Sequence, residues 1–518
     1  MLRATALAIV VIMAALPTAA QTVSWDAGGD GVSWHDALNW DTNTVPTAAD
    51  NVLVTLAGTY TVTLSSAASA ASVTLGGGAG GQTLEIGPCC GLTVVGNMAV
   101  NAGGTFRVRR DTGIGGSLAV AAGGYVEMNP GEACCGAQLT IANGFQNSGT
   151  LQVTSSVSQA SGITVTSGTL TNMSGGMIDI ANGAGGSRTI NAAVSNSGTL
   201  KFGVTGNLTG SLTNTAAGVI DVNPSVPCCD AVPTIVGNLM NSGLITLSSN
   251  VSQASGITVT SGTLANNAGG MLDIANGAGG SRSINATVSN SGTLHFGVTG
   301  NLTGSLTNTA AGVIDVNPAA PCCTAIPTIV GNLMSSGLIT LSSSVSQASG
   351  ITVTSGMLTN GGTLEMLPGA GGMRELNGTV SNTGTLTVAT PSNLSGNYSI
   401  SAGTVNLSSP TPVSLNTLAV SGGILTGTGV VNVTGMTSLS NGTLGGGGIT
   451  NANGGMTIVG GGAITNGRVL NIFGSTTHRG GFSSSMFENA VINNHGTYTL
   501  TADSGWNSPG GGAPTFNN

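Results

Sequence analysis

Short runs of alternating apolar and polar residues recur along most of the chain, separated by glycine, asparagine and serine. Met177–Ile180 and Val219–Val222 are two such runs, in which apolar and β-branched side chains fall at every second position. This alternation is typical of a β-strand with one buried face. No helical pattern lies between the runs. The sequence therefore predicts an all-β protein.

The runs return at regular intervals, each introduced by an asparagine or serine, small residues and a glycine. These introductions begin at Asn147, Asn172, Asn196, Asn214, Asn241, Asn266, Asn290, Asn308, Ser335 and Asn360. Their residue numbers differ by 25, 24, 18 and 27 in a repeating order, with a mean of 23.5. Because few Asn-Gly pairs join one strand directly to the next, coiling is a simpler solution than hairpins. We predict a right-handed parallel β-helix, or β-solenoid, of about 21 rungs stacked ~4.8 Å apart, with about 23.5 residues per rung.

A long duplication underlies this periodicity. Residues 157–250 and 251–344 align without a gap and differ at 13 of 94 positions, and a partial third copy covers 345–383. The solenoid is accordingly expected over 61–383. From 384 to 518 the repeats loosen into degenerate rungs that keep their glycine corners, and the chain stops in what resembles the start of another rung. We expect a truncated gene product there.

The N-terminus has the features of an export signal. Residues 1–20 combine one basic residue, an apolar stretch and small residues before a cleavage point. The apolar stretch is shorter than the ~20 residues that span a bilayer. We therefore expect a secreted or cell-surface protein with no membrane span in the mature chain.

Residues 21–60 differ in composition and are predicted to form an N-terminal cap. Bulky indoles can cover the exposed strand edges and apolar core at the end of a solenoid. The tryptophans of this segment are Trp25, Trp34 and Trp40. A calcium site at Asp26 and Asp30 is the weaker interpretation, because the alternating acids and distal glutamate of an EF-hand loop are missing.

The opening VSWDAGGDGVSWHDALNWDTNTVPTAADNVLV and the later NSGTL and LTN phrases resemble a known group of sequences. They are similar to bacterial exported β-helix repeat proteins of the filamentous-haemagglutinin-like and autotransporter-passenger-like kinds. The likeness covers most of residues 22–518. It implies a surface adhesin or structural stalk. No NPNG-type secretion signature is found near the N-terminus.

The eight cysteines all occur as adjacent pairs. The pairs are Cys89-Cys90, Cys134-Cys135, Cys228-Cys229 and Cys322-Cys323. The residue numbers of successive pairs differ by 45, 94 and 94, which corresponds to two, four and four rungs, or ~10 and ~19 Å. A disulfide needs Cα atoms within about 7 Å, so different pairs should not bond to one another within a chain. Each pair could form a vicinal disulfide, link chains through free thiols, or bind a soft metal. Metal is the least favoured, since CxxC spacing and partner histidines are absent.

Proline marks the segments around these pairs as loops. Asn223–Pro227 precedes one pair and Pro233 follows it, and Pro318, Pro321 and Pro327 recur around the next. Proline cannot take part in a strand ladder. The loops are predicted to project at regular intervals from one side of a rod. They could serve recognition or simply accommodate a bulge.

Charged residues give little support for catalysis. Asp179, Asp221, Asp273 and Asp315 recur as isolated strand positions and are expected on the solvent face, where they would oppose association. Arg107 and Arg109, near Arg110, Asp111 and Glu127, are expected on another exposed face. The histidines His35, His295, His478 and His495 are scattered, and His295 replaces Lys201 of the first copy. No cofactor motif is present.

Net charge limits the partners. A formal charge of −8 and a single lysine argue against nucleic acid and anionic membranes. A surface glycan, a protein or a second copy of the chain are the remaining partner classes.

We predict a non-enzymatic secreted scaffold, or adhesin-like stalk, that presents repeated Cys-Cys loops. The alternatives are a carbohydrate-active β-helix of the polysaccharide lyase or hydrolase type, and a structural filament or matrix component. An ice-binding surface is a minor alternative, because the Thr-Val-Thr segments at Thr164, Thr258 and Thr352 come only once in four rungs.

Overall fold

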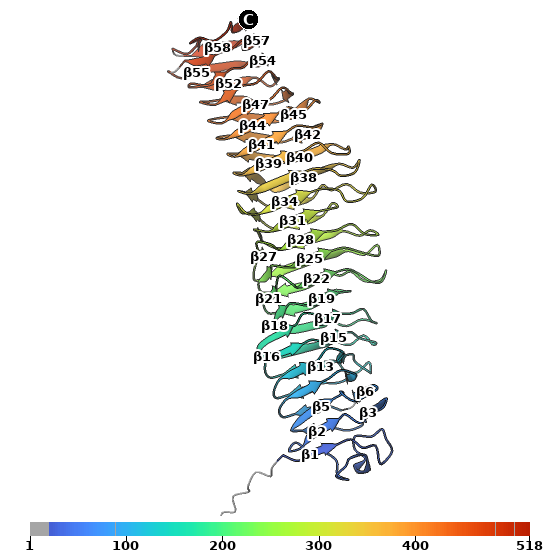
Figure 1. Ribbon diagram of the computed structural model, residues 1–518. Helices are drawn as coiled ribbons and strands as arrows, with labels where there is room; N and C mark the ends of the chain where they lie inside the picture. Colours follow the sequence, from blue (N-terminus) through green and yellow to red (C-terminus); the bar gives the residue numbers. More distant parts are fainter. Residues whose placement is uncertain (1–19, 89, 482, 502) are drawn as a thin grey trace, which may run out of the picture.

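The chain forms one continuous rod in which the turns of a β-helix stack on one another (Figure 1). The structure, a computed structural model, describes residues 20–88, 90–481, 483–501 and 503–518, so the predicted signal peptide lies outside it apart from its last residue. The rod has about 21 turns of about 22 residues each. The described residues include one helix, the 3-10 helix η1 (Ala37–Asn39), which is capped at its N-terminus by Asp36, whose side chain accepts a hydrogen bond from the Leu38 amide. The predicted all-β parallel β-solenoid is confirmed.

Most turns contribute strands to three columns that run along the rod, which we call columns 1, 2 and 3. In the first 94-residue copy, one turn places β17 (Met177–Ile180) in column 1, while the two halves of β18 (Arg188–Asn196) form columns 2 and 3. The next turn supplies β19 (Thr199–Phe202), β20 (Asn207–Thr209) and β21 (Leu212–Asn214) to the same columns. Every pairing between adjacent turns here is parallel.

The remaining turns of both copies follow the same order. In the first copy they are β22 (Val219–Val222), β23 (Thr234–Val236), β24 (Leu239–Asn241), β25 (Leu244–Leu247), β26 (Ser255–Thr260) and β27 (Leu264–Asn266). In the second copy they are β28 (Met271–Ile274), β29 (Arg282–Asn285), β30 (Val288–Asn290), β31 (Thr293–Phe296), β32 (Asn301–Thr303), β33 (Leu306–Asn308), β34 (Val313–Val316), β35 (Thr328–Val330), β36 (Leu333–Ser335) and β37 (Leu338–Leu341). The long strand β38 (Ser349–Asn360) follows. Column 1 extends from β3 (Tyr60–Leu64) to β59 (Trp506–Asn507).

The strand register explains the repeat length. Met177 pairs with Thr199, Thr199 with Val219, Val219 with Leu244 and Leu244 with Met271. Along this series the residue numbers rise by 22, 20, 25 and 27, from 177 to 271, which is the length of one copy. Four turns therefore make one copy, as the sequence predicts. Beyond the duplication the turns shorten, as between β41 (Thr385–Val388) and β44 (Thr404–Leu407), which lowers the overall mean to about 22.

The core consists of like side chains stacked from turn to turn. In column 1, Ile178, Leu200, Ile220 and Ile245 are in register and at most 1% exposed. Burying one such side chain contributes about 1.5–3 kcal/mol before the cost of chain ordering. Because the inner positions come at period two, the intervening side chains point outward and form rows of their own.

A buried row of asparagines runs along the corner between columns 3 and 1. Asn172 Nδ2 donates to Asn196 Oδ1 at 2.7 Å, and Asn196 Nδ2 donates to Asn214 Oδ1 at 2.7 Å. The members of this row, which we call the asparagine ladder, are Asn147, Asn172, Asn196, Asn214, Asn241, Asn266, Asn290, Asn308, Ser335, Asn360 and Asn382. A buried amide is stable only when its donors and acceptors are satisfied, and stacking identical amides one turn apart meets that requirement.

The tryptophan-rich segment packs at the N-terminal end of the rod. Trp34 and Trp40 are fully buried, with ring centroids 4.9 Å apart, and Trp25 meets Trp40 edge-on at 5.1 Å. The Trp34 amide donates a hydrogen bond to the Thr63 carbonyl oxygen of β3. This bond joins the tryptophan-rich segment to the first strand of column 1. Parallel pairing starts before residue 61, because β1 (Thr22–Ser24) pairs with β2 (Asn51–Val54) in column 3.

Candidate functional site: the loop edge

All four Cys-Cys loops leave the rod at the same edge, between columns 1 and 2. They connect β6 (Gln82–Ile86) to β7 (Leu92–Val94), β12 (Tyr125–Met128) to β13 (Ala137–Ile141), β22 to β23, and β34 to β35. In column 1 these loops are separated by two, four and four turns. Figure 1 shows the long loops projecting on one side. We call this side the loop edge.

The cysteine pairs differ in state within the structure. Cys228 is bonded to Cys229 and Cys322 to Cys323, each as a vicinal disulfide. Cys134 and Cys135 are unbonded, with their Sγ atoms 2.9 Å apart. Cys89 lies outside the described residues. Hydrogen bonds from Cys134 and Arg110 hold the pKa of the Cys135 thiol below its usual range, which favours its thiolate.

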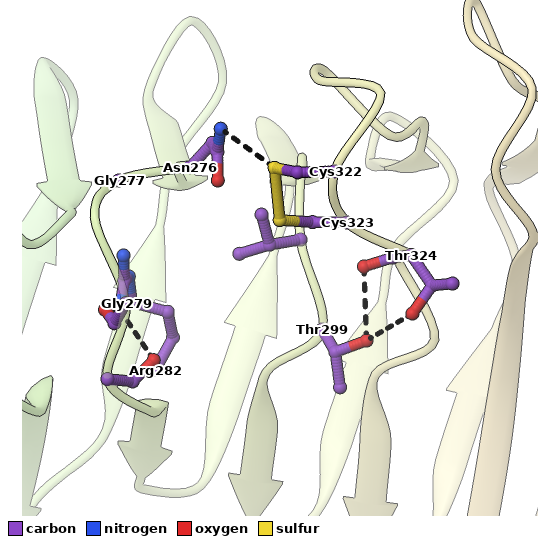
Figure 2. Close-up of a pocket in the computed structure, with 10 residues that line it drawn as sticks. Asn276, Gly277, Gly279, Arg282, Thr299, Cys322, Cys323 and Thr324 are labelled. Carbon is purple, nitrogen blue, oxygen red and sulfur yellow. Dashed lines mark hydrogen bonds between the residues drawn. A yellow bond between two sulfur atoms is a disulfide. The ribbon is translucent and has the colours of Figure 1, made fainter. Parts of the chain in front are cut away.

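Two equivalent pockets lie beside the two vicinal disulfides. In the second copy, the loop 275–281 and the Cys-Cys loop 317–327 are both long, whereas the loop 297–300 on the turn between them is short. The gap above the short loop is a pocket of about 360 Å³, open to solvent. It is lined by Asn276, Gly277, Gly279, Gly280, Arg282, Val298, Thr299, Cys322, Cys323 and Thr324. Figure 2 shows the disulfide facing Asn276, with Thr299 and Thr324 beneath it.

The first copy repeats this arrangement. Its pocket, about 240 Å³, is lined by Asn182, Gly183, Gly185, Gly186, Arg188, Val204, Thr205, Cys229 and Asp230. The duplication equates Asp230 with Thr324, and these are the only aligned lining positions at which the two copies differ. One pocket therefore has a carboxylate where the other has a hydroxyl.

A buried arginine forms one wall of each pocket. Arg282 is 3% exposed, and its Nη1 donates to the carbonyls of Gly279 and Gly280 at 2.6 and 2.8 Å. Its Nε donates to the Ala275 carbonyl at 3.2 Å. No carboxylate of the described chain lies within ion-pair distance of Arg282, and its Nη2 has no hydrogen-bond partner there. Burial lowers the pKa of Arg282, because desolvation disfavours the charged guanidinium.

Gly280 shows why the loop beneath Arg282 is rich in glycine. Its φ is +73°, and an added Cβ would lie 1.9 Å from the Gln253 carbonyl oxygen of the previous turn. Only glycine fits this left-handed position against the neighbouring backbone. The close approach places two carbonyls where the arginine can reach them.

A row of charged side chains occupies the outer face of column 1, away from the pockets. In register, Asp179, Lys201 and Asp221 follow one another in the first copy, and Asp273, His295 and Asp315 in the second. The aspartates are two turns apart, as expected, but they are not isolated, because a basic side chain lies between the two aspartates of each copy. The sequence contains this signal, because Lys201 and His295 occupy the same strand position on the intermediate turn.

The charges in this row interact across turns. His295 Nδ1 lies 2.7 Å from Asp273 Oδ1, and Nε2 lies 4.0 Å from Asp315 Oδ2. The hydrogen bond to Asp273 raises the pKa of His295, while burial opposes that rise. Further toward the N-terminus, Arg107 and Arg109 lie 3.3–3.8 Å from Glu85 and Glu127. Arg107 is partly exposed, as predicted, but Arg109 is largely covered, with 17% of its side chain exposed.

The acidic turn at the N-terminus uses its carboxylates for backbone hydrogen bonds. Asp30 Oδ1 accepts from the Val32 and Ser33 amides and from Asn39 Nδ2, at 2.7–2.8 Å. These bonds lower the pKa of Asp30. Asp26 accepts from the Gly28 amide. No group of three or more histidine, cysteine, aspartate or glutamate side chains that could hold a metal ion occurs among the described residues.

Comparisons with known proteins place the chain in no family. No protein-family model and no curated protein matches the sequence. Among solved structures, the chain is similar to the crystal structure of a TibC-catalysed, hyper-glycosylated TibA fragment, residues 55–350 of that protein. The identity is 14%, the match covers 63% of this chain and 92% of that chain, and the TM-score is 0.30. Within the described part of the chain, no helix has the length and apolar character needed to cross a bilayer.

Proposed function

We propose that this protein is a secreted or cell-surface β-solenoid stalk that works as an adhesin-like scaffold, with recognition at the loop edge. The observation that carries the proposal is the alignment of the Cys-Cys loops along one side of a rod on the order of 100 Å long. A parallel solenoid adds length at low cost, because every turn satisfies the backbone of its neighbours. Loops repeated along one edge of the rod allow several weak contacts to act together.

We assign no catalytic role to the carboxylates. Acid–base catalysis on a polysaccharide requires two carboxyl groups converging on one bond. The carboxylates of Glu85, Glu127 and Asp273 instead lie within ion-pair distance of arginine or histidine on an outward face, and neither disulfide pocket includes a carboxylate of column 1. The carbohydrate-active alternative predicts release of reducing ends from a polysaccharide, so absence of such release from a broad polysaccharide panel is the expected result.

The oxidising exterior favours vicinal disulfides in all four pairs of the secreted protein. Mass spectrometry after thiol alkylation tests this assignment. We expect no alkylation of the non-reduced monomer and eight alkylated cysteines after reduction. Disulfide-linked dimers or larger species would instead support the structural-filament alternative.

Binding to surfaces provides the direct test of the adhesin-like role. The full chain should bind whole cells or immobilised surface extracts, and variants that shorten the Cys-Cys loops 223–233 and 317–327 to four residues should lose this binding. Loops of four residues already occur at 203–206 and 297–300 in the same rod, so the shortened variants should remain folded. Equal binding by the shortened variants would contradict recognition at the loop edge.

A further inference from the structure

The two disulfide pockets combine features that suit a sugar ring. A vicinal disulfide presents two sulfur atoms and their methylene groups as a rigid apolar surface without strong hydrogen-bond donors. In the second copy, Val298 extends this apolar wall. The pocket of the second copy, about 360 Å³, lies within the ~300–1,000 Å³ that is usual for small-molecule sites, and the pocket of the first copy, about 240 Å³, lies just below that range. The pocket is open, so it can receive one unit of a longer chain.

Polar groups converge on the same space from the other walls. Asn276 Nδ2 lies 3.9 Å from Cys322 Sγ, and Thr299 Oγ1 lies 3.4 Å from Thr324 Oγ1. Arg282 adds a cation whose Nη2 has no partner in the described chain. A pyranose offers a matching pair of surfaces, because its C–H groups pack on apolar walls while its hydroxyls hydrogen-bond with amides, hydroxyls and guanidinium.

We propose that each disulfide pocket is a saccharide subsite, in which a pyranose ring packs on the vicinal disulfide with its hydroxyls toward the Asn and Thr side chains. This inference rests on the proposed function and specifies the ligand class of the loop edge. The two subsites differ in charge preference. In the pocket beside the Cys322-Cys323 disulfide, which we call the Cys322 pocket, Arg282 faces no carboxylate, so a sugar that carries a carboxylate is accepted. In the pocket beside the Cys228-Cys229 disulfide, which we call the Cys228 pocket, Asp230 repels the same group, so a neutral sugar is preferred.

Repetition strengthens binding to a polymer. The two pockets are four turns apart, or ~19 Å along the rod. An oligosaccharide long enough to reach both would engage the second pocket at a high effective concentration. A monosaccharide would bind each pocket weakly and independently.

The experiment uses the full oxidised chain and two probes, cellotetraose as a neutral oligosaccharide and tetragalacturonate as an acidic one. Binding is followed by saturation-transfer NMR and by calorimetry. To isolate one pocket, the other disulfide is removed, as in Cys228→Ser with Cys229→Ser. In that background, the Cys322 pocket should bind tetragalacturonate at least fivefold more tightly than the Cys228 pocket does in the reciprocal background.

The matched variants exchange the one lining position that differs. Thr324→Asp should weaken tetragalacturonate binding about tenfold at the Cys322 pocket and change cellotetraose binding less than twofold. Asp230→Thr should strengthen tetragalacturonate binding about tenfold at the Cys228 pocket and change cellotetraose binding less than twofold. Each new residue already occupies the equivalent position of the other copy, and circular dichroism should remain unchanged.

The outcomes separate this inference from the proposed function. Binding of both probes that is lost only on removal of both disulfides supports the subsites. If neither probe binds, or if binding survives removal of both disulfides, the subsites are refuted. Should the chain then still attach to cells through its loop edge, the adhesin-like role stands without them.

Discussion

The two 94-residue copies share one backbone plan, yet they differ at a position in each of three features described above. The buried ladder has Asn241 in the first copy and Ser335 in the second, the charged row has Lys201 or His295, and the pocket has Asp230 or Thr324. The column 1 pairings of the first copy recur in the second between the equivalent strands and in the same register. The comparison teaches that the backbone plan is set by corners and ladders, while the chemistry of the side chains can change from copy to copy.

The ladder position shows what such a change costs. In the first copy, Asn241 Nδ2 donates to Asn266 Oδ1 at 2.7 Å. In the second, Ser335 is too short to continue the row, and Asn360 Oδ1 is buried without a hydrogen-bond partner. An unsatisfied buried acceptor costs roughly 1–3 kcal/mol. The junction after the second copy therefore contains a weak point that the junction after the first copy lacks.

The largest effect is expected from breaking the intact ladder. Asn266→Ala removes the acceptor of Asn241 and the donor to Asn290 Oδ1, both at 2.7 Å, and leaves a small cavity. The local free energy of unfolding should fall by about 3 kcal/mol. Hydrogen exchange of the amides in β24, β27 and β30 measures this loss turn by turn, which suits a repeat protein that does not unfold in one step.

Ser335→Ala is the control, because the ladder is already interrupted there. Its cost should be about 1 kcal/mol, equivalent to one hydrogen bond. Equal losses for the two variants would show that the ladder adds nothing beyond separate contacts.

A smaller gain is expected from repairing the second copy. Ser335→Asn supplies a donor for Asn360 Oδ1 and should stabilise the adjoining turns by about 1 kcal/mol. The reciprocal change, Asn241→Ser, should destabilise the first copy by a similar amount. Hydrogen exchange in β36 and β38 reports the gain, and slower exchange only in distant turns would contradict the explanation.

The smallest effect concerns pH. The hydrogen bond to Asp273 raises the folded-state pKa of His295 above its ordinary value of 6.5. The resulting stabilisation is complete below about pH 6.5 and is lost as pH rises through the raised value. Exchange protection in β28, β31 and β34 should therefore decrease from pH 6 to pH 8, by less than about 1 kcal/mol for this partly exposed pair. Exchange protection in β17, β19 and β22 should stay constant over this pH range, because Lys201 stays charged.

His295→Lys makes the second copy match the first and should abolish this pH dependence. Lys201→His should introduce it into the first copy. If the two copies respond to pH alike before any substitution, His295 is not the group responsible.

Much of the fold could be predicted because its signals are local and periodic. Alternation in segments such as Val219–Val222 predicts strands, and the 94-residue repeat predicts four turns per copy. The position of the Cys-Cys loops on one edge follows from their spacing. The asparagine ladder was visible as a recurring marker, but that its amides bond to one another depends on register between turns.

The pockets and the charged row were not predictable for the same reason. Arg282 and Cys322 are far apart in the sequence and meet only because the short loop 297–300 lies between two long ones. Asp273 and His295 are also remote until the register of β28 and β31 aligns them. Both features come from loop length and register, which a strand pattern alone does not specify.

The most direct test of the stacked-turn account is a distance along the loop edge. Spin labels attached through non-canonical residues at Glu132 and Thr324, both exposed on Cys-Cys loops, are separated by eight turns. Pulsed electron paramagnetic resonance should give a single distance distribution centred near ~38 Å, eight times the ~4.8 Å strand spacing. A distribution centred below about 25 Å would mean that the strands fold back on one another, and would contradict the solenoid and the row of pockets together.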